Sequence, residues 1–112
     1  MSSNIRHIAV LTGKRGGYGA MKPMLRLIDD DPELRLSLIV TDQHLNPLFG
    51  ATASEIERDF EIAARVEMDQ ADDSALGRAV ALGRCLGGMA EALARLAPDI
   101  LVLYGDRGEV LV

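Results

Sequence analysis

The 112-residue sequence contains one cysteine, no tryptophan and only four other aromatic residues. A single cysteine excludes an intramolecular disulfide framework and a metal site built from cysteines alone, so a reducing, cytoplasmic setting fits best. Twelve basic against seventeen acidic residues leave a net charge of −5, which argues against nucleic acid as a partner, because phosphate backbones attract clustered cations. The amino-terminal residues show no signal-peptide pattern. The longest apolar run, Ile100–Tyr104, is far shorter than the ~18–20 residues that span a bilayer, so we expect no membrane partner.

What the chain does contain is a regular alternation of short apolar runs with longer segments of helical period. With 48% apolar residues it has enough apolar material to collapse around a core. Four runs predict strands, at residues 8–11, 36–40, 62–68 and 100–104. The first, second and fourth are apolar on both faces, which is typical of parallel strands covered by helices.

The segments between these runs predict helices. Residues 17–30 place four apolar side chains on one stripe, and Pro23 lies near enough to the start of that helix to be tolerated there. Asp31 and Pro32 mark its end. A short helix is expected at residues 54–59. The stripe consists of Met21, Met24, Leu25 and Ile28.

The longest predicted helix covers residues 73–97, with Asp72 or Asp73 available as its N-cap. Gly87 and Gly88 in its middle lower helix propensity, and we attribute them to close packing on the sheet. Cys85 is expected to be a packed thiol. The predicted apolar stripe comprises Leu76, Ala79, Val80, Gly83, Leu86, Ala90, Leu93 and Ala97.

This β-α-β-α-β-α-β order predicts an α/β fold with a Rossmann-like parallel sheet of four strands and three to four helices. Ligands of such sheets bind beyond the carboxyl ends of the strands. The first strand is followed there by Thr12–Gly19, which reads Thr-Gly-Lys-Arg-Gly-Gly-Tyr-Gly. Glycines allow close approach of the backbone, the next helix directs its N–H groups at an anion, and Lys14 and Arg15 add positive charge. We interpret this loop as a phosphate site; the alternative is a flexible turn with solvated basic residues.

Two further strand ends carry polar residues. His44 follows the second strand and is either a substrate contact or a surface or hydrogen-bonded loop residue. His7 lies at the opposite end of the sheet and is expected to be structural. Asp106, Arg107 and Glu109 follow the fourth strand. A carboxylate beside other charges in a cleft can acquire the pKa needed for proton transfer, and the equally weighted alternative is that the aspartate caps the next helix.

Taken together, the three strand ends resemble motifs of one enzyme family, the UDP-N-acetylglucosamine 2-epimerases, and within it the hydrolysing branch of bacterial sialic-acid-type sugar synthesis. The family's first loop is Thr-Gly-x-Arg-x-x-Tyr-Gly, and its second and fourth strands end in Thr-Gly-x-His and Gly-Asp-Arg-aromatic-Glu. The matching residues are Thr12, Gly13, Arg15, Tyr18, Gly19, Thr41, His44, Phe49, Gly50, Gly105, Asp106, Arg107 and Glu109. The departures are Gly17 for a glutamate, Asp42 for a glycine and Gly108 for the aromatic residue.

The resemblance implies a two-domain fold of the GT-B type, with residues 1–112 forming the N-terminal part of the first Rossmann-like domain and the second domain absent from this chain. It implies elimination of UDP from a UDP-sugar, then addition of water, without a metal or redox cofactor. Asp106 would be the catalytic carboxylate, Arg15 would contact the diphosphate, and His44 and Arg107 would shape the sugar side. The full implied substrate-binding set is Gly13, Arg15, Tyr18, His44, Arg107 and Glu109. We expect residues 1–112 alone to be inactive.

A second enzyme class also fits part of the pattern. Residues 12–19 match Thr-Gly-x-x-x-Gly-x-Gly, the cofactor loop of NAD(P)-dependent short-chain dehydrogenases, and Asp69 resembles their adenine-contacting aspartate. The fourth strand should then end in Asn-Asn-Ala-Gly, and it does not. In either case the fourth strand would leave an edge and apolar surface uncovered, so we expect a homo-oligomer.

Overall fold

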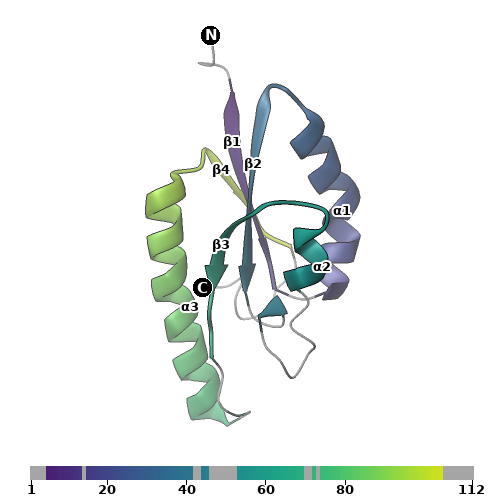
Figure 1. Cartoon of the computed structure of the whole chain (residues 1–112). Coiled ribbons are helices and arrows are strands. Elements are labelled where there is room, and N and C mark those ends of the chain that lie inside the picture. The colour runs from purple at the N-terminus through teal and green to yellow at the C-terminus, as the bar shows by residue number, and fades with distance from the viewer. Residues whose placement is uncertain are drawn as a thin grey trace.

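The computed structural model describes residues 5–13, 15–41, 44–45, 53–69, 72 and 74–104, with the side chain of Arg15 outside the description. Within them, strands and helices alternate in the predicted order (Figure 1). The elements are β1 (Arg6–Thr12), α1 (Arg15–Asp30), β2 (Leu34–Thr41), α2 (Ala53–Glu57), β3 (Ile62–Val66), α3 (Ala75–Leu96) and β4 (Ile100–Val102).

The strands form a parallel sheet in the order β3-β2-β1-β4. β1 lies inside the sheet, and its residue Ile8 is in register with Leu36 on β2 and with Ile100 on β4. The chain therefore reverses its direction of travel across the sheet after β3. In parallel α/β sheets such a switch point is where the crevice for a ligand opens, at the carboxyl ends of the strands.

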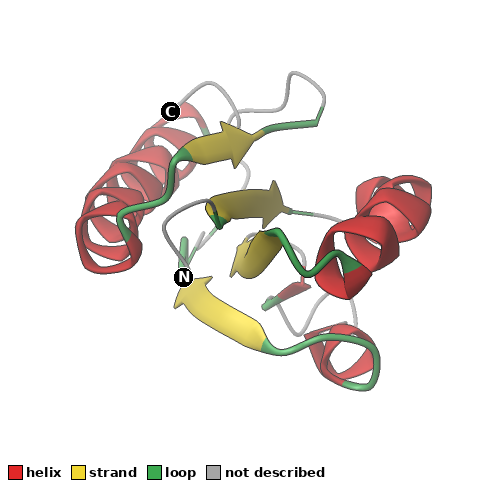
Figure 2. Ribbon diagram, turned by 90° about the horizontal axis from the view of Figure 1, so that it is seen from above, coloured by secondary structure: helices red, strands yellow, loops and turns green. Residues whose placement is uncertain are grey.

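Helices cover both faces of the sheet, with α1 and α2 on one side and α3 on the other (Figure 2). Successive residues of β1 point to opposite faces: Ile8 and Val10 pack under α1, whereas Ala9 and Leu11 pack under α3. This two-sided burial is why the strands are continuous apolar runs rather than alternating ones.

Helix α1 begins two residues earlier than the sequence pattern predicts. Pro23 therefore lies in the middle of the helix rather than in its first turn, where it removes one internal hydrogen bond. The predicted stripe is confirmed, since Met21, Leu25 and Ile28 are buried and Met24 packs beside them. Burial of that stripe compensates for the interrupted hydrogen bonding.

The predicted buried stripe of α3 is wrong. Leu76 and Leu86 are 74% and 57% exposed, and the fully buried side chains of the face against the sheet are instead small or sulfur-containing. Of the predicted stripe, Leu93 does pack against this face, beside Leu82 and Leu96. Apolar residues occur on nearly every side of this helix, so its periodicity alone did not identify the buried face. The buried residues are Ala81, Cys85, Met89 and Ala92, which confirms Cys85 as a packed thiol.

The glycine pair of α3 splits into two cases. A Cβ atom on Gly88 would lie 2.6 Å from Cγ1 of Val66 on β3, so this glycine does permit close packing on the sheet. A Cβ atom on Gly87 would meet nothing within 4 Å. The packing explanation therefore holds for Gly88 and fails for Gly87.

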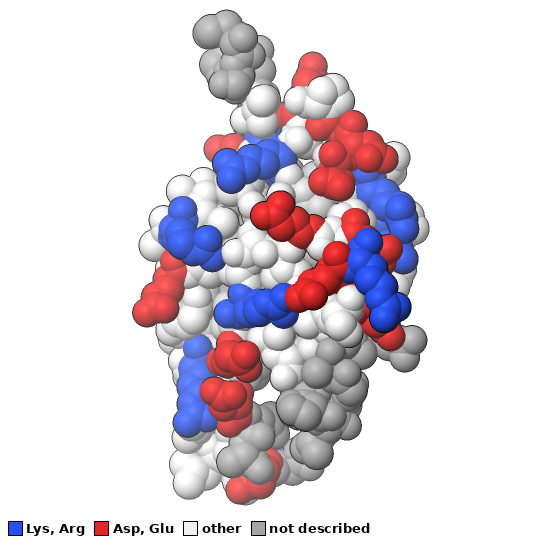
Figure 3. Space-filling model, in the orientation of Figure 1, with Lys and Arg blue, Asp and Glu red and all other residues white. Residues whose placement is uncertain are grey.

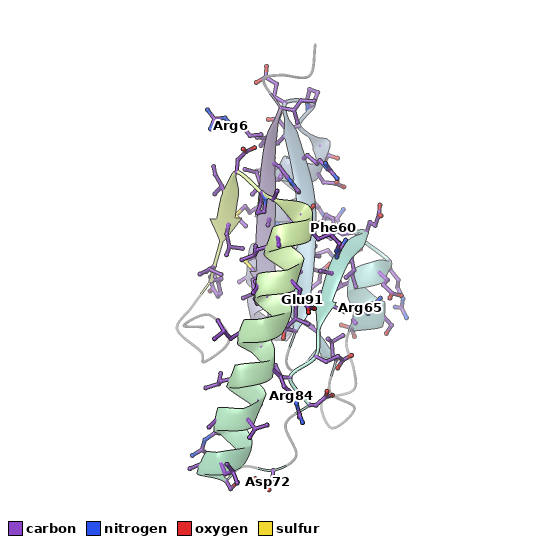
Figure 4. All side chains as sticks on the ribbon, turned by 90° about the vertical axis from the view of Figure 1, so that its left-hand side faces the viewer. Arg6, Phe60, Arg65, Asp72, Arg84 and Glu91 are labelled. Carbon is purple, nitrogen blue, oxygen red and sulfur yellow. The ribbon has the colours of Figure 1, made fainter. Side chains whose placement is uncertain are left out.

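Ser74 is the N-cap of α3, in place of the predicted aspartates. Its hydroxyl oxygen accepts a hydrogen bond from the backbone N–H of Gly77 at 3.0 Å. The Asp72 carboxylate accepts a 2.8 Å hydrogen bond from the backbone N–H of Ser74, ahead of the helix, and Asp72 lies at the start of the helix in Figure 4. Asp73 lies outside the described residues. The serine hydroxyl is thus the acceptor for the first turn, and the Asp72 carboxylate binds the backbone of that serine.

The charged residues on the face shown in Figure 3 are interspersed, and neither sign forms a continuous patch there. None of the helices in the described part of the chain is both long and apolar enough to cross a membrane.

Candidate functional site at the carboxyl ends of the strands

Two threonine hydroxyls connect the segments at the carboxyl ends of β1, β2 and β3. Thr41, the last residue of β2, donates a 2.6 Å hydrogen bond from its hydroxyl to the carbonyl oxygen of Val66, the last residue of β3. Thr12, the last residue of β1, has its hydroxyl oxygen 2.9 Å from Nε2 of His44. The segment after β2 is thus fastened to β1, and β2 itself to β3.

His44 is completely enclosed, with 0% of its surface exposed. Of the interpretations that the sequence left open, a surface position is wrong, and the structure shows a hydrogen-bonded loop residue. Direct contact between this side chain and a substrate stays a prediction. His7, by contrast, lies at the amino end of β1, where its ring is 2.5 Å from the hydroxyl of Ser37, so its structural role is confirmed.

Tyr18 in the first turn of α1 is the neighbour of His44. Its ring meets His44 edge-on at a centroid distance of 6.2 Å and meets Phe60 in the same way at 6.4 Å. Only 6% of Tyr18 is exposed. Phe60 itself lies just before β3 (Figure 4). These T-shaped contacts favour one orientation of each ring, because the positive ring edge faces the negative ring face.

The phenol hydroxyl of Tyr18 donates a 2.8 Å hydrogen bond to Oδ2 of Asp59. The ammonium group of Lys22 lies 2.9 Å from the same oxygen, and the guanidinium of Arg26 lies 3.6 Å from Oδ1. Lys22 and Arg26 also approach the ring faces of Tyr18 and Phe60, at 6.0 and 5.9 Å from the centroids. One carboxylate thus gathers three side chains of α1.

This arrangement separates the protonation states of its two central groups. Burial, followed by the hydrogen bond to Asp59 and the negative charge of Asp59, raises the pKa of the Tyr18 phenol above its ordinary value. Hydrogen bonds from Lys22 and then from Tyr18 lower the pKa of the Asp59 carboxyl below its ordinary value. At neutral pH the pair is therefore a neutral donor and an ionised acceptor.

The predicted phosphate loop begins in the expected place. Gly13 directly follows β1 and is half-buried, and Arg15 is the first residue of α1. The first turn of α1 contains no acidic residue of its own that would oppose an anion at the helix N-terminus. Lys14 and the side chain of Arg15 lie outside the description.

The predicted catalytic end of the fourth strand also lies outside the described residues. Tyr104, 54% exposed, is the last residue described there. The roles inferred for Asp106, Arg107 and Glu109 remain predictions. The remaining motif positions also lie outside the described residues; they are Asp42, Phe49, Gly50, Gly105 and Gly108.

Sequence reasoning missed the cluster around Asp59. Tyr18, Lys22 and Arg26 recur every four residues, which predicts that they share one face of α1. Nothing local indicates that Asp59 is their common partner, because it is separated from Tyr18 by 41 positions and enters through the fold. As for metals, among the described residues there is no group of three or more His, Cys, Asp or Glu side chains that could hold an ion.

A model of the UDP-N-acetylglucosamine 2-epimerase family matches residues 26–112, well over half of the chain. The chain belongs to this family. It is 38% identical over 108 residues to a UDP-N,N'-diacetylbacillosamine 2-epimerase (hydrolyzing) of Legionella pneumophila, covering 96% of this chain and 29% of the relative. It is 30% identical over 106 residues to a GDP/UDP-N,N'-diacetylbacillosamine 2-epimerase (hydrolyzing) of Campylobacter jejuni, covering 95% and 28%.

Solved structures of epimerases share the fold. A UDP-N-acetylglucosamine 2-epimerase superposes with a TM-score of 0.75 at 17% identity, over 95% of this chain and 28% of that one. The Neisseria meningitidis UDP-GlcNAc 2-epimerase bound to UDP-GlcNAc superposes with a TM-score of 0.70 at 14% identity, over 92% and 27%. The chain thus spans less than a third of the length of these relatives. Nothing in these comparisons favours the short-chain dehydrogenase alternative.

Proposed function

We propose that the full-length protein is a hydrolysing UDP-sugar 2-epimerase. It eliminates UDP from UDP-N-acetylglucosamine or a related UDP-sugar and then adds water, releasing an N-acetylmannosamine-type sugar and UDP with inversion at C2. The observation that carries this proposal is the membership of a 2-epimerase family, and the glycine-rich turn from β1 into α1 supplies a fitting anion site. The remaining length of the relatives is where the second domain of the GT-B-type fold would lie.

The first step removes the proton from C2 while the bond between C1 and the diphosphate oxygen breaks. In the second step a water hydroxyl adds to C1 and a proton returns to C2 on the opposite face. Asp106 is the proposed carboxylate in this proton transfer, and Arg107 and Glu109 belong to the sugar side of the cleft. No redox change occurs, because the proton lost in elimination is replaced by one from solvent.

Binding of the diphosphate falls to the start of α1. Gly13 lets the backbone approach the phosphates, the first-turn N–H groups of α1 donate to them, and Arg15 supplies a positive charge. Tyr18 and His44 are enclosed, so their proposed contribution is to support the conformation of this loop and of the sugar-binding part of the site from the protein interior.

The Legionella relative is named for UDP-linked N,N'-diacetylbacillosamine, and the Campylobacter relative for the GDP- or UDP-linked sugar. We propose a diacetylated, deoxygenated UDP-sugar as the preferred substrate. The test incubates the full-length protein with UDP-N-acetylglucosamine and with UDP-N,N'-diacetylbacillosamine and measures UDP release. In deuterated water the released sugar should carry deuterium at C2.

Three variants make the test specific. Asp106→Asn should abolish UDP release, Arg15→Met should weaken UDP binding at least tenfold, and Glu57→Gln, at a surface pair with Arg65, should change neither. Residues 1–112 alone should be inactive. Tight NADPH binding with no response to UDP would instead identify a dehydrogenase.

We also propose that the protein acts in the cytoplasm as a homo-oligomer. Leu76, Val80 and Leu86 of α3 are exposed although large and apolar, and a second copy would remove them from water. Light scattering of the full-length protein should report a dimer or larger species, and replacing Leu76 and Leu86 by glutamate should dissociate it. A monomer at high concentration would mean that the rest of the polypeptide covers these side chains instead.

A further inference from the structure

The geometry points to Asp59 as a positioning residue for the diphosphate site: it fixes α1, and through Tyr18 it fixes His44 behind the glycine-rich loop. This inference rests on the proposed function for what the loop binds. It concerns a residue between α2 and β3 that belongs to none of the three strand-end motifs. Asp59 reaches the loop only through other side chains, so it is not placed among the groups that touch the substrate.

The first step is the anchoring of the carboxylate itself. The backbone N–H groups of Asp59 and Phe60 both donate to the carbonyl oxygen of Ile56, each at an N···O distance of 2.9 Å. Ile56 is fully buried in the core between α1, α2 and the sheet. The turn that carries Asp59 is therefore tied to the core, and its carboxylate is a fixed point against which α1 can be held.

The second step is convergence on that fixed point. Tyr18, Lys22 and Arg26 stand one turn apart along α1, and all three contact the Asp59 carboxylate, at 2.8, 2.9 and 3.6 Å. Contacts spread over two turns resist both rotation of α1 about its axis and sliding along it. The rotation and the axial position of α1 together set the direction of the N–H groups in its first turn, which face the proposed diphosphate.

The third step leads from Asp59 to the loop. The Tyr18 ring packs edge-on against His44, and His44 is hydrogen-bonded to the hydroxyl of Thr12 at 2.9 Å. Thr12 immediately precedes Gly13. All three side chains are buried, so a change in the Tyr18 ring position has no solvent gap to absorb it. Two side-chain contacts thus separate the Tyr18–Asp59 hydrogen bond from Thr12, the residue before the glycines.

The test compares steady-state kinetics of the full-length protein with Asp59 changed to Asn and with the control Glu57→Gln. Glu57 is two residues away and pairs with Arg65 on the surface. Asp59→Asn keeps an acceptor for Tyr18 but loses the charge that pairs with Lys22 and Arg26. We expect KM for the UDP-sugar to rise about tenfold, with kcat within about threefold of wild type. Asp59→Glu should recover part of the KM effect, and the control should leave both constants unchanged.

A purely structural role would give a different pattern. It would lower the melting temperature of Asp59→Asn and leave KM at the wild-type value in assays well below that temperature, which would overturn the inference. Tyr18→Phe provides a second route should Asp59→Asn fold poorly. It should also raise KM, and the double variant should raise KM by less than the two single effects combined, because both changes weaken the same Tyr18–Asp59 contact. Additive effects on KM would also overturn the inference.

A separate measurement keeps the inference distinct from the proposed function. If wild-type protein neither binds UDP nor turns over a UDP-sugar, the proposed function fails. The coupling of Asp59 to the loop is still measured by the NMR signals of the His44 imidazole and the Gly13 amide. Asp59→Asn should shift both and Glu57→Gln neither, and unshifted signals would refute the coupling.

Discussion

The Tyr18 hydroxyl and the Asp59 carboxylate form a 2.8 Å hydrogen bond between residues that are 41 positions apart. One partner belongs to the first turn of α1 and the other to the turn between α2 and β3, so the bond joins the helix of the first crossover to that of the second. Two cations on α1 keep the carboxylate ionised, and burial keeps the phenol neutral. The contact should therefore affect both the stability of the fold and the dependence of that stability on pH.

Tyr18→Phe should destabilise the fold by about 1–2 kcal/mol, because a hydrogen bond to a charged acceptor is lost while the ring packing is kept. Urea denaturation followed by circular dichroism measures the change. Tyr104→Phe, at an exposed tyrosine, should leave the midpoint unchanged and serves as the matched control. Equal midpoints for the two variants would mean that the hydrogen bond contributes nothing net.

Stability should fall at alkaline pH because of Tyr18. The folded pKa of this phenol is raised above the value of about 10 that it has when unfolded. Its contribution is therefore complete below pH ~10 and is lost as pH rises from there toward the folded pKa, since only the unfolded chain releases the proton. Denaturation midpoints between pH 8 and 11 should decline less steeply for Tyr18→Phe than for the wild type. Identical slopes would contradict the shift.

At acidic pH the corresponding change comes from Asp59. Its folded pKa is lowered, so its contribution is present above its unfolded pKa of about 4 and disappears as pH falls below it toward the folded value. Asp59→Asn should flatten the dependence of the midpoint on pH between about pH 5 and 2. Glu57→Gln, at a surface pair with Arg65, removes an acidic group from the same region and is the matched control. An Asp59→Asn profile as steep as that of the wild type would place the acid sensitivity elsewhere.

The glycine pair in α3 should respond in opposite directions to the same substitution. Gly87→Ala adds a methyl group into open space and should stabilise the fold by about 0.5–1 kcal/mol through helix propensity. Gly88→Ala places its methyl 2.6 Å from Val66 Cγ1 and should destabilise by about 1–2 kcal/mol, because overpacking outweighs the propensity gain. Thermal melts of both variants check this, and stabilisation by Gly88→Ala would show that α3 can move off β3 without loss.

Ser74→Ala should destabilise by about 1 kcal/mol, since the first turn of α3 loses the acceptor for the Gly77 N–H. Ser74→Gly lacks the same acceptor, but glycine is itself a favourable N-cap residue, so it should cost only about a few tenths of a kcal/mol. Chemical denaturation of the two variants separates loss of the side-chain acceptor from any effect of backbone conformation. Equal losses would assign the whole effect to the hydroxyl acceptor, which both variants lack.

Much of the fold could be predicted because local patterns of apolar residues indicate its strands and helices. The run Ile8–Leu11 is apolar at every position, which is typical of a strand that is buried on both faces. The stripe of α1 was identified for a related reason, since polar residues surround Met21, Leu25 and Ile28. In α3 the pattern failed, because apolar residues on all sides leave the choice of buried face to packing.

The candidate site divides in the same way. Gly13 and Arg15 were predicted as binding residues from their position after a strand, and the structure confirms only that position, between β1 and α1. The enclosure of His44 and its contact with Thr12 could not be predicted, because burial depends on what packs above the loop. Ser74 was missed as a cap because Asp72 is an equally good cap by residue type, and only the geometry of the turn distinguishes them.

By itself, the sequence determined the order of strands and helices, the glycine-rich turn after β1 and the resemblance to a family of 2-epimerases. These follow from interactions between residues close together in the chain, whose periodicity and conformational preferences are written locally. The tertiary structure alone decided which face of α3 is buried, that His44 is enclosed, and that Asp59 is the partner of Tyr18, Lys22 and Arg26. Those outcomes depend on segments brought together by the sheet, and the shape and charge of the partner are fixed only once the layers have packed.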